Sequence, residues 1–367
     1  MHKTLCLALL LAASAAHALT AEESQTLRQA AITAGKQGDD ATAFAHWQTL
    51  AEAGDAEAQL TLGLLHYQGD VTAQDSAQAL KWLQKAAARD HADAQFILGS
   101  LYERGELGFT QDDGKAREWF EKSATQGNAK AQYELGLIYA QGTGVPQDLA
   151  QAAVWWEKAA TQGIAQAQHN IGALYNKGQG VPQDIAKARE WFEKAAAQGF
   201  AESQYNLGTF YYTGRGVPKD IEQARAWFEK AAAQDHAAAQ HNLGTLYAQG
   251  LGVARDYDKA REWFEKAAVQ GLPEGQYSLG ALYDNGAGVT QDYGKAREWY
   301  EKAAAQGNAT AQYNLGNFYN DGRGVPQDFA KAREWYEKAA AQEDNEFAQQ
   351  AARQALQDLN KTGGKKP

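Results

Sequence analysis

A unit of 36 residues recurs eight times along this chain of 367 residues. Each unit contains a Leu-Gly or Ile-Gly pair, and the glycines of these pairs are Gly63, Gly99, Gly136, Gly172, Gly208, Gly244, Gly280 and Gly316. Successive glycines lie 36 residues apart, except for the second step of 37. A strict period of this length is typical of a stacked solenoid, whose units bury their apolar faces on one another. The period also argues against an enzyme, because catalysis needs one unique constellation of residues and a repeat supplies a surface.

The unit that begins at Ala201 predicts two helices. Apolar or small residues, and the stem of one glutamine, occupy unit positions 1, 4, 7, 8 and 11, which predicts a first helix with one packing face. Gly208 falls in the middle of this helix, where glycine costs about 1 kcal/mol relative to alanine. We therefore expect a close contact between helices at the glycine position, which a Cβ atom would block.

A turn and a second helix complete each unit. Gly214 and Gly216 are expected to end the first helix, Pro218 cannot continue it, and Asp220 is suited to cap the next one. All eight units keep this aspartate, as Asp75, Asp112, Asp148, Asp184, Asp220, Asp256, Asp292 and Asp328. All eight also keep a tryptophan in the second helix, as Trp82, Trp119, Trp155, Trp191, Trp227, Trp263, Trp299 and Trp335. We expect the buried side of this helix to carry Ala224, Trp227, Phe228, Ala231 and Ala232.

The polar side of the second helix repeats as well. Arg189 precedes Glu193 by four residues, and Glu190 precedes Lys194 by four. Pairs at this spacing stabilise a helix by a few tenths of a kcal/mol each. They predict a solvated convex surface and not an acid/base pair.

The first 18 residues have the pattern of a secretory signal peptide. A short basic start precedes an apolar stretch from Leu5 to Ala13, and Ala16 and Ala18 place small residues where a signal peptidase cleaves. The apolar stretch is too short to span a bilayer, and no second one follows. We expect an exported chain, with the periplasm as its location and secretion as the alternative. The single cysteine, Cys6, lies in this leader, so the mature chain would have neither a disulfide nor a cysteine ligand.

The expected fold is all-α, an α/α superhelical solenoid of about eight 36-residue helix-turn-helix repeats with capping helices. In this organisation residues 1–18 form the signal peptide and residues 19–55 form degenerate N-terminal capping helices. Residues 56–344 form the eight repeats. Residues 345–360 form a C-terminal capping helix, and residues 361–367 form a disordered tail.

The composition excludes several classes of chemistry. A net charge of −10 disfavours nucleic acid as a partner, because nucleic-acid binding needs clustered lysine and arginine. No histidine, aspartate and glutamate cluster has metal-ligand spacing, and the Gly-x-Gly-Val turns lack the Lys-Ser/Thr of a phosphate-binding loop. We expect no catalytic residue, no metal site, no cofactor and no transmembrane segment.

Three segments of the unit resemble a known repeat. The pattern Ala-x-Ala-Gln-Tyr-Asn-Leu-Gly-x-x-Tyr, then Gly-x-Gly-Val-Pro-Gln-Asp, then Lys-Ala-x-x-Trp-Phe-Glu-Lys-Ala-Ala-x-Gln-Gly, resembles the tetratricopeptide-like Sel1-like repeat of exported bacterial proteins. The resemblance implies a right-handed superhelix whose first helices line the concave surface, and a scaffold that binds other proteins. Some cysteine-rich exported relatives bind or hydrolyse β-lactams. This sequence lacks their cysteines, so a β-lactamase-like hydrolase is not expected.

Two neighbouring positions of the first helix form the candidate site on the concave face. Position 5 is aromatic or imidazole in six successive units, as Tyr133, His169, Tyr205, His241, Tyr277 and Tyr313. Position 6 is asparagine in four units, as Asn170, Asn206, Asn242 and Asn314. In tetratricopeptide repeats, the asparagine of a matching Tyr-Asn-Leu-Gly stretch reaches the backbone of a bound extended peptide, so the resemblance implies this role for the four asparagines. The alternative is that the position-5 residues pack between adjacent first helices and the asparagines are merely solvated.

The two ends of this face differ in polarity. The first two units are more apolar at positions 5 and 6, with Leu60, Phe96 and Ile97, whereas the last two add Asp284 and Asp321. The difference suggests that a partner docks an apolar anchor near the N-terminal end.

The preferred interpretation is a non-enzymatic protein–protein interaction scaffold or adaptor of the cell envelope, which binds a partner protein or an extended peptide. A toxin-neutralising immunity protein and a peptidoglycan- or carbohydrate-binding module are the alternatives.

Overall fold

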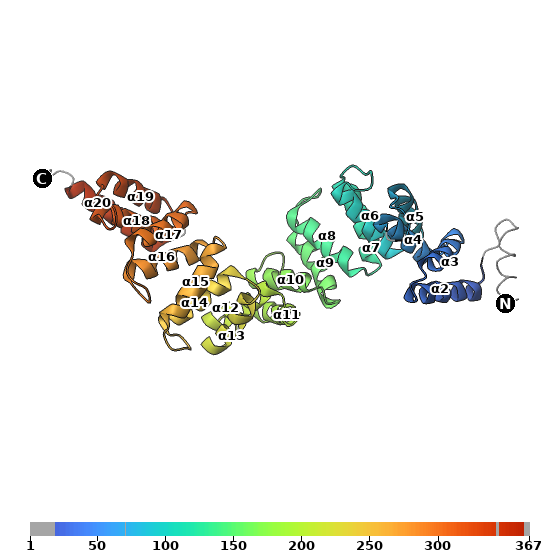
Figure 1. Cartoon of the computed structure of the whole chain (residues 1–367), viewed down its shortest axis with the longest axis horizontal. Coiled ribbons are helices and arrows are strands. Elements are labelled where there is room, and N and C mark those ends of the chain that lie inside the picture. The colour runs from blue at the N-terminus through green and yellow to red at the C-terminus, as the bar shows by residue number, and fades with distance from the viewer. Residues whose placement is uncertain (1–18, 70, 343–344, 363–367) are drawn as a thin grey trace. The chain divides into compact units, whose positions relative to one another are not determined.

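The structure, a computed structural model, consists of helices joined by short turns (Figure 1). It describes residues 19–69, 71–342 and 345–362, and no strand occurs in these ranges. The helices are α2(Ala21–Lys36), α3(Asp40–Glu52), α4(Ala56–Gln68), α5(Ser76–Ala88), α6(Ala92–Arg104), α7(Asp113–Thr125), α8(Ala129–Gln141), α9(Leu149–Thr161), α10(Ala165–Lys177), α11(Ile185–Ala197), α12(Ala201–Thr213), α13(Ile221–Ala232), α14(Ala237–Gln249), α15(Tyr257–Val269), α16(Pro273–Asn285), α17(Tyr293–Ala305), α18(Ala309–Asp321), α19(Phe329–Ala341) and α20(Glu346–Thr362). From α4 to α19 they alternate as the first and second helices of eight repeats, which confirms the predicted all-α solenoid.

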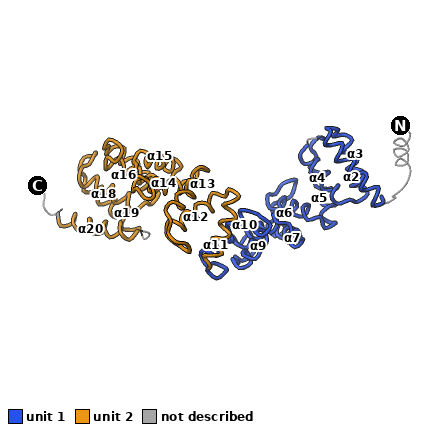
Figure 2. The backbone as a smooth tube through the Cα atoms, turned by 90° about the horizontal axis from the view of Figure 1, so that it is seen from below, with its two compact units in different colours: residues 1–183 blue, residues 184–367 orange. Residues whose placement is uncertain are grey.

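The chain divides into two compact units, residues 1–183 and residues 184–367 (Figure 2). In unit 1, successive helices from α2 to α10 pack on one another. In unit 2, the helices from α11 to α20 pack in the same order, and α20 also contacts α18. Each unit is therefore a stack whose core is made by successive helix pairs.

Glycine and aspartate set the ends of the helices in every repeat, as predicted. Gly214 ends α12 in the left-handed conformation, with φ of 77°, and its N–H donates to the carbonyl of Phe210. Asp220 then caps α13, because its carboxylate accepts from the N–H of Gln223 at 3.0 Å. The equivalent aspartate accepts a backbone hydrogen bond at the start of each of the eight second helices.

The mid-helix glycine marks the closest contact between the two helices of a repeat. A Cβ atom on Gly208 would lie 2.5 Å from Cδ1 of Phe228, and one on Gly244 would lie 2.6 Å from Cδ1 of Phe264. Both rings belong to the second helix of the same repeat and are buried. The predicted close approach is confirmed, and it explains why the helix tolerates glycine here.

A glutamine ladder, which the sequence did not reveal, connects the repeats within each unit. Position 4 of every first helix is a buried glutamine. Gln132, for example, donates to the carbonyl of Ala124 in the preceding helix at 3.1 Å, and its own Oε1 accepts from Gln162 of α9's C-terminus at 2.7 Å. Gln240 makes the same two contacts in unit 2, with Ala232 at 3.4 Å and Gln270 at 2.8 Å. The whole amide is buried, and not only its stem.

The repeated tryptophan is more exposed than expected. Apart from Trp82, which is buried, the eight tryptophans are half-buried. Trp263 packs against an apolar cluster formed by the preceding repeat and its own, so it contributes to the interface between repeats. A lysine three residues later covers the exposed side of each ring: Lys194 lies 4.0 Å from the centre of Trp191. Arg189 pairs with Glu193 at 3.3 Å, as predicted.

Additional helices flank the eight repeats. α2 begins with a capping box between Thr20 and Glu23, and Leu50 of α3 is buried against α4. At the other end, α20 buries Ala352 and Leu359 against α19. It continues to Thr362, beyond the expected end at residue 360. The predicted signal peptide, and residues 363–367 of the predicted tail, lie outside the described residues.

Candidate interaction face

The first helices expose one side, formed by positions 5, 6, 9 and 12, which we call the first-helix face. In α12 these positions are Tyr205, Asn206, Thr209 and Tyr212, and all four are partly exposed. Positions 2 and 13 flank this face and are almost all fully exposed. The candidate residues of positions 5 and 6 therefore lie together on one side of the helices in each unit.

The opposite side differs from the expected packing face. Positions 3, 4, 7, 8 and 10 are buried in α12, including Ser203 and Phe210, whereas Tyr211 at position 11 is partly exposed. The reason is that a first helix such as α12 packs between two second helices, α11 and α13. Position 3 contacts the second helix of the preceding repeat, since a Cβ on Gly275 would lie 2.8 Å from Cβ of Ala267. Position 8 contacts the second helix of the same repeat. The buried stripe is consequently wider than one helix contact requires.

The aromatic and imidazole rings of position 5 are part of the core as well as of the face. Tyr205 packs on Phe228 with ring centres 5.9 Å apart, and His241 packs on Phe264 at 5.5 Å. Tyr277 and Tyr313 pack in the same way on Tyr300 and Tyr336, both at 5.7 Å. These partners lie in the second helix of the same repeat, so the rings are fixed and only their polar edges reach the face.

Those polar edges lie beside position 6 of the following repeat. Ser278 occupies this position beside His241, with 3.1 Å between its Oγ and Nε2 of the imidazole. Burial raises the pKa of Tyr133 in unit 1, and the side chain of Asn170 opposes that rise. In unit 2, Asn314 has the same effect on the pKa of Tyr277. Asn170 and Asn314 thus interact with a tyrosine of the preceding repeat, which the sequence pattern could not show.

The asparagines keep part of their surface exposed. Asn206 and Asn242 occupy position 6 of α12 and α14, and both are partly exposed, as Asn170 and Asn314 are. His169 is also partly exposed at position 5 of α10. All ten candidate residues therefore reach the first-helix face with a partly accessible side chain.

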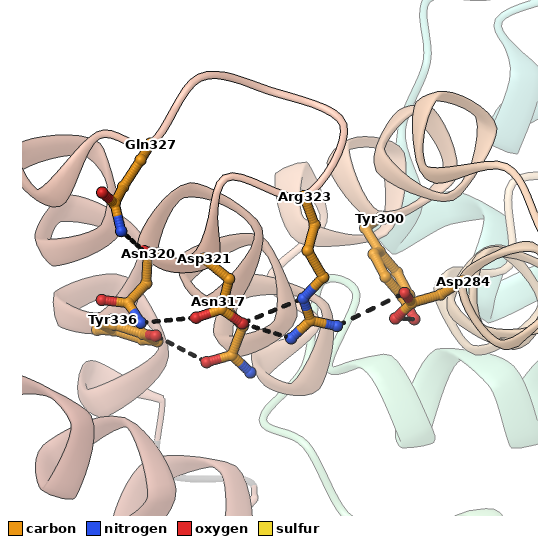
Figure 3. Close-up of polar contacts among 8 residues, drawn as sticks. All are labelled: Asp284, Tyr300, Asn317, Asn320, Asp321, Arg323, Gln327 and Tyr336. Atoms are coloured by element: carbon orange, nitrogen blue, oxygen red, sulfur yellow. Dashed lines mark hydrogen bonds and ion pairs between the residues drawn. The ribbon is translucent and has the colours of Figure 1, made fainter.

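A polar network covers the first-helix face at the end of unit 2 (Figure 3). Its centre is Arg323, which follows α18 and lies between two carboxylates. Its guanidinium is 2.8 Å from Oδ2 of Asp321 and 3.7 Å from Oδ1 of Asp284 in the preceding repeat. Burial raises the pKa of Asp284, while Arg323 and the hydroxyl of Tyr300 oppose that rise.

Two buried tyrosines donate hydrogen bonds to this network from the core. Tyr300 and Tyr336 occupy the position that is phenylalanine in most other repeats, and each is almost fully buried. Tyr300 donates to Asp284 at 3.2 Å, and Tyr336 donates to Asn317 at 2.7 Å. Burial raises the pKa of both phenols. The only sequence signal for these contacts was the coincidence of tyrosine in the core with polar residues at positions 9 and 12.

Unit 1 carries a different group of charges on the same face. Glu103 of α6 and Glu134 of α8 occupy positions 12 and 6, and both are partly buried. Burial and the charge of Glu103 raise the pKa of Glu134 to about 7, and Arg104 opposes the rise. Burial also raises the pKa of Glu103. Within the described ranges, no group of three or more histidine, cysteine, aspartate or glutamate residues could hold a metal ion.

Comparison with known families identifies the repeat. The Sel1 repeat profile matches eight consecutive segments, residues 56–91, 92–128, 129–164, 165–200, 201–236, 237–272, 273–308 and 309–344. The chain belongs to the Sel1 repeat family. Sel1 repeats form protein-interaction scaffolds, and the helix pairs described above are their structural units. No protein with a curated description matches the chain.

Two solved Sel1 repeat structures are similar to this chain. One is a protective antigen present in uropathogenic Escherichia coli strains displaying an SLR fold. It is 34% identical, with a TM-score of 0.73 over 87% of this chain and 72% of that chain. The other is a Sel1 repeat protein from Oxalobacter formigenes, 33% identical, with a TM-score of 0.63 over 95% of this chain and 99% of that chain. Among the helices that the structure describes, none has the length and apolar character needed to cross a membrane.

Proposed function

We propose that this Sel1 repeat protein is a non-enzymatic scaffold of the cell envelope, which binds a partner protein or an extended peptide on its first-helix face. The observation that carries the proposal is the repetition of partly exposed polar edges on a rigid support. Each ring is held by the second helix of its own repeat, as Tyr277 is by Tyr300, and its polar edge lies beside position 6 of the following repeat.

The chemistry of the face suits a polypeptide. An asparagine amide both donates and accepts, so it matches the alternating N–H and C=O groups of an extended backbone. Tyrosine offers a large contact area with few rotatable bonds, and packing against the second helix has already removed much of that freedom. Side chains fixed before binding lose less entropy when the partner arrives.

The location in the cell envelope is part of the proposal and rests on the leader sequence. The basic start, the short apolar stretch and the small residues before residue 19 support export. Sequencing the N-terminus of the protein recovered from the periplasmic fraction tests this directly. A mature chain that begins at Leu19 supports export, and an intact Met1 in the cytoplasmic fraction contradicts it.

The binding proposal is tested with paired substitutions on two faces of unit 2. Asn206→Ala with Asn242→Ala removes two amides from the first-helix face. Glu190→Ala with Glu262→Ala removes two exposed carboxylates from second helices and serves as the control. Affinity capture from cell-envelope extract, followed by binding measurements with the recovered protein, should show weaker binding only for the asparagine pair, by about tenfold.

Both variants should melt within a few degrees of the wild type, because all four side chains are at least partly exposed. Equal affinity of the asparagine variant and the wild type would place the binding surface elsewhere. Recovery of glycan fragments alone would favour the carbohydrate-binding alternative.

A further inference from the structure

Position 12 of the first helices carries a carboxylate in only two repeats, as Glu103 in unit 1 and Asp284 in unit 2. Both side chains are partly buried, and burial raises the pKa of both. A carboxylate that loses part of its hydration is stable only where a cation or hydrogen-bond donors replace the water. The two sites differ in the groups that replace the lost water.

The turn of one repeat reaches position 12 of the repeat before it. In unit 2, position 15 of the last repeat is Arg323, which lies 3.7 Å from Asp284. In unit 1, position 15 of the second repeat is Glu106, which accepts a hydrogen bond from the hydroxyl of Tyr67 at 3.3 Å. Since Tyr67 is also a position-12 residue, the same two positions meet once in each unit, and only one of these contacts is a charged pair.

Asp284 therefore finds both kinds of partner within its own chain. Arg323 provides the cation, and the hydroxyl of Tyr300 donates a hydrogen bond from the core at 3.2 Å. The guanidinium occupies the first-helix face at this point, as Figure 3 shows.

Glu103 has neither of these partners. The equivalent turn residue is Thr143, whose hydroxyl contacts the side chain of Gln141 at 3.5 Å. The equivalent core residue is Phe120, which has no hydroxyl to donate. Arg104 is largely exposed and pairs with Glu106, with 3.9 Å between the closest charged atoms.

The next repeat adds a second carboxylate instead of a cation. Glu134 occupies position 6 of α8, where four other repeats carry asparagine. In the part of the chain that the structure describes, neither Glu103 nor Glu134 makes an ion pair. Two partly buried carboxylates thus lie in unit 1 near the place that a guanidinium fills in unit 2.

Apolar side chains share the first-helix face of unit 1 with this pair. Leu64, Ile97 and Leu137 occupy positions 9, 6 and 9 of α4, α6 and α8, and all three are partly exposed. Leu64 and Ile97 pack against the apolar cluster that includes Leu98. A guanidinium suits such a setting, because it is planar, is weakly hydrated and can donate to two carboxylates at once.

We propose that the first-helix face of unit 1 binds an arginine side chain of the partner on Glu103 and Glu134, while apolar residues beside that arginine contact Leu64, Ile97 and Leu137. The proposal rests on the protein-binding function above and names the chemistry of the segment that is bound. In unit 2 the corresponding place is filled by Arg323, so that end of the face selects for other groups.

The test uses two short fluorescein-labelled peptides that differ in one group. Each has leucines and serines around a central residue, which is arginine in one peptide and its neutral analogue citrulline in the other. Fluorescence anisotropy with the full chain should show about tenfold tighter binding of the arginine peptide, the size expected of a close charge pair. Equal affinity for the two peptides would overturn the proposal.

Four variants assign the preference to this site. Glu103→Gln with Glu134→Gln should abolish it, as should Thr143→Arg, which supplies an internal guanidinium at the position equivalent to Arg323. Thr143→Gln adds length without charge and should keep the preference, as should Asp284→Asn in unit 2. Removing two like charges from a partly buried site does not destabilise the fold, so circular dichroism should show wild-type helicity in the glutamine variant. A preference that survives in that variant overturns the assignment.

The partner recovered from the envelope separates this inference from the function on which it rests. A partner lost by the Asn206 and Asn242 variant but bound normally by the Glu103 and Glu134 variant would support the scaffold function and overturn the arginine site. A partner lost by both variants supports both proposals.

Discussion

At the scale of single residues, the environment decides the role that a repeated position plays. Position 6 is asparagine in four repeats, and Asn314 opposes the burial-raised pKa of Tyr277 in the preceding repeat, whereas Glu134, at the same position, lies near the charge of Glu103. The same backbone thus presents a neutral amide in one place and a group that titrates near neutrality in another.

The raised pKa of Glu134 predicts how stability depends on pH. The folded state holds this proton up to about pH 7, whereas an unfolded glutamate releases it near pH 4.5. Between these pH values Glu134 holds more of its proton in the folded state than in the unfolded state. The contribution of Glu134 to stability therefore falls as the pH rises through this window. Glu103, which raises the pKa, and Arg104, which lowers it, are the charged neighbours.

Glu134→Gln removes this penalty. The difference in unfolding free energy between the variant and the wild type should grow by about 1 kcal/mol from about pH 5 to about pH 8. This is less than the full pKa shift implies, because the side chain is partly exposed. Urea unfolding at the two pH values measures the gain. A difference between variant and wild type that is the same at both values would contradict the assignment of the raised pKa.

At the scale of helices, most of the fold was predictable because the signals are local. Glycine at the end of a first helix and aspartate at the start of a second one act within a few residues, so Gly214 and Asp220 could be assigned from the sequence. The width of the buried stripe could not, because it depends on a second helix of the preceding repeat. The burial of the Gln132 amide was also missed, because a polar side chain is expected at the surface unless its hydrogen-bond partners are known.

The caps offer a test at this scale. Asp220→Ala removes the hydrogen bond to the N–H of Gln223 and should cost about 1 kcal/mol, whereas Asp220→Asn keeps an accepting oxygen and should cost far less. Urea unfolding of both variants measures the difference. If the two substitutions cost the same, the negative charge at the helix start matters more than the bond.

At the scale of the whole molecule, the sequence predicted the architecture better than the contacts on the candidate face. The period gave the eight repeats and their order, since stacking follows from each repeat having two faces to bury. The candidate residues were placed on one side of the first helices, but their contacts between repeats were not foreseen. Such contacts join residues in different repeats, as His241 and Ser278 do across 37 positions, and a pattern within one repeat does not contain them.

Deleting one whole repeat tests the stacking at this scale. Removal of residues 237–272 joins His236 to Pro273, and Gln276 would then find the carbonyl of Ala232 in place of that of Ala268. The shortened chain should keep its helicity per residue and unfold in one transition at lower urea, because fewer interfaces remain. Removal of residues 237–254 leaves a second helix without its partner and should lower helicity. Equal circular dichroism spectra for the two deletions would contradict independent repeats.

The pair formed by Asp284 and Arg323 has a consequence for how such a gene can change. Repeats that share a backbone can be duplicated or lost by recombination, but this pair spans two of them and is broken by the insertion of a copy without arginine at position 15. Such a copy would leave an aspartate without its cation. The order of the last two repeats is thereby inherited as one block, while other copies are freer to move.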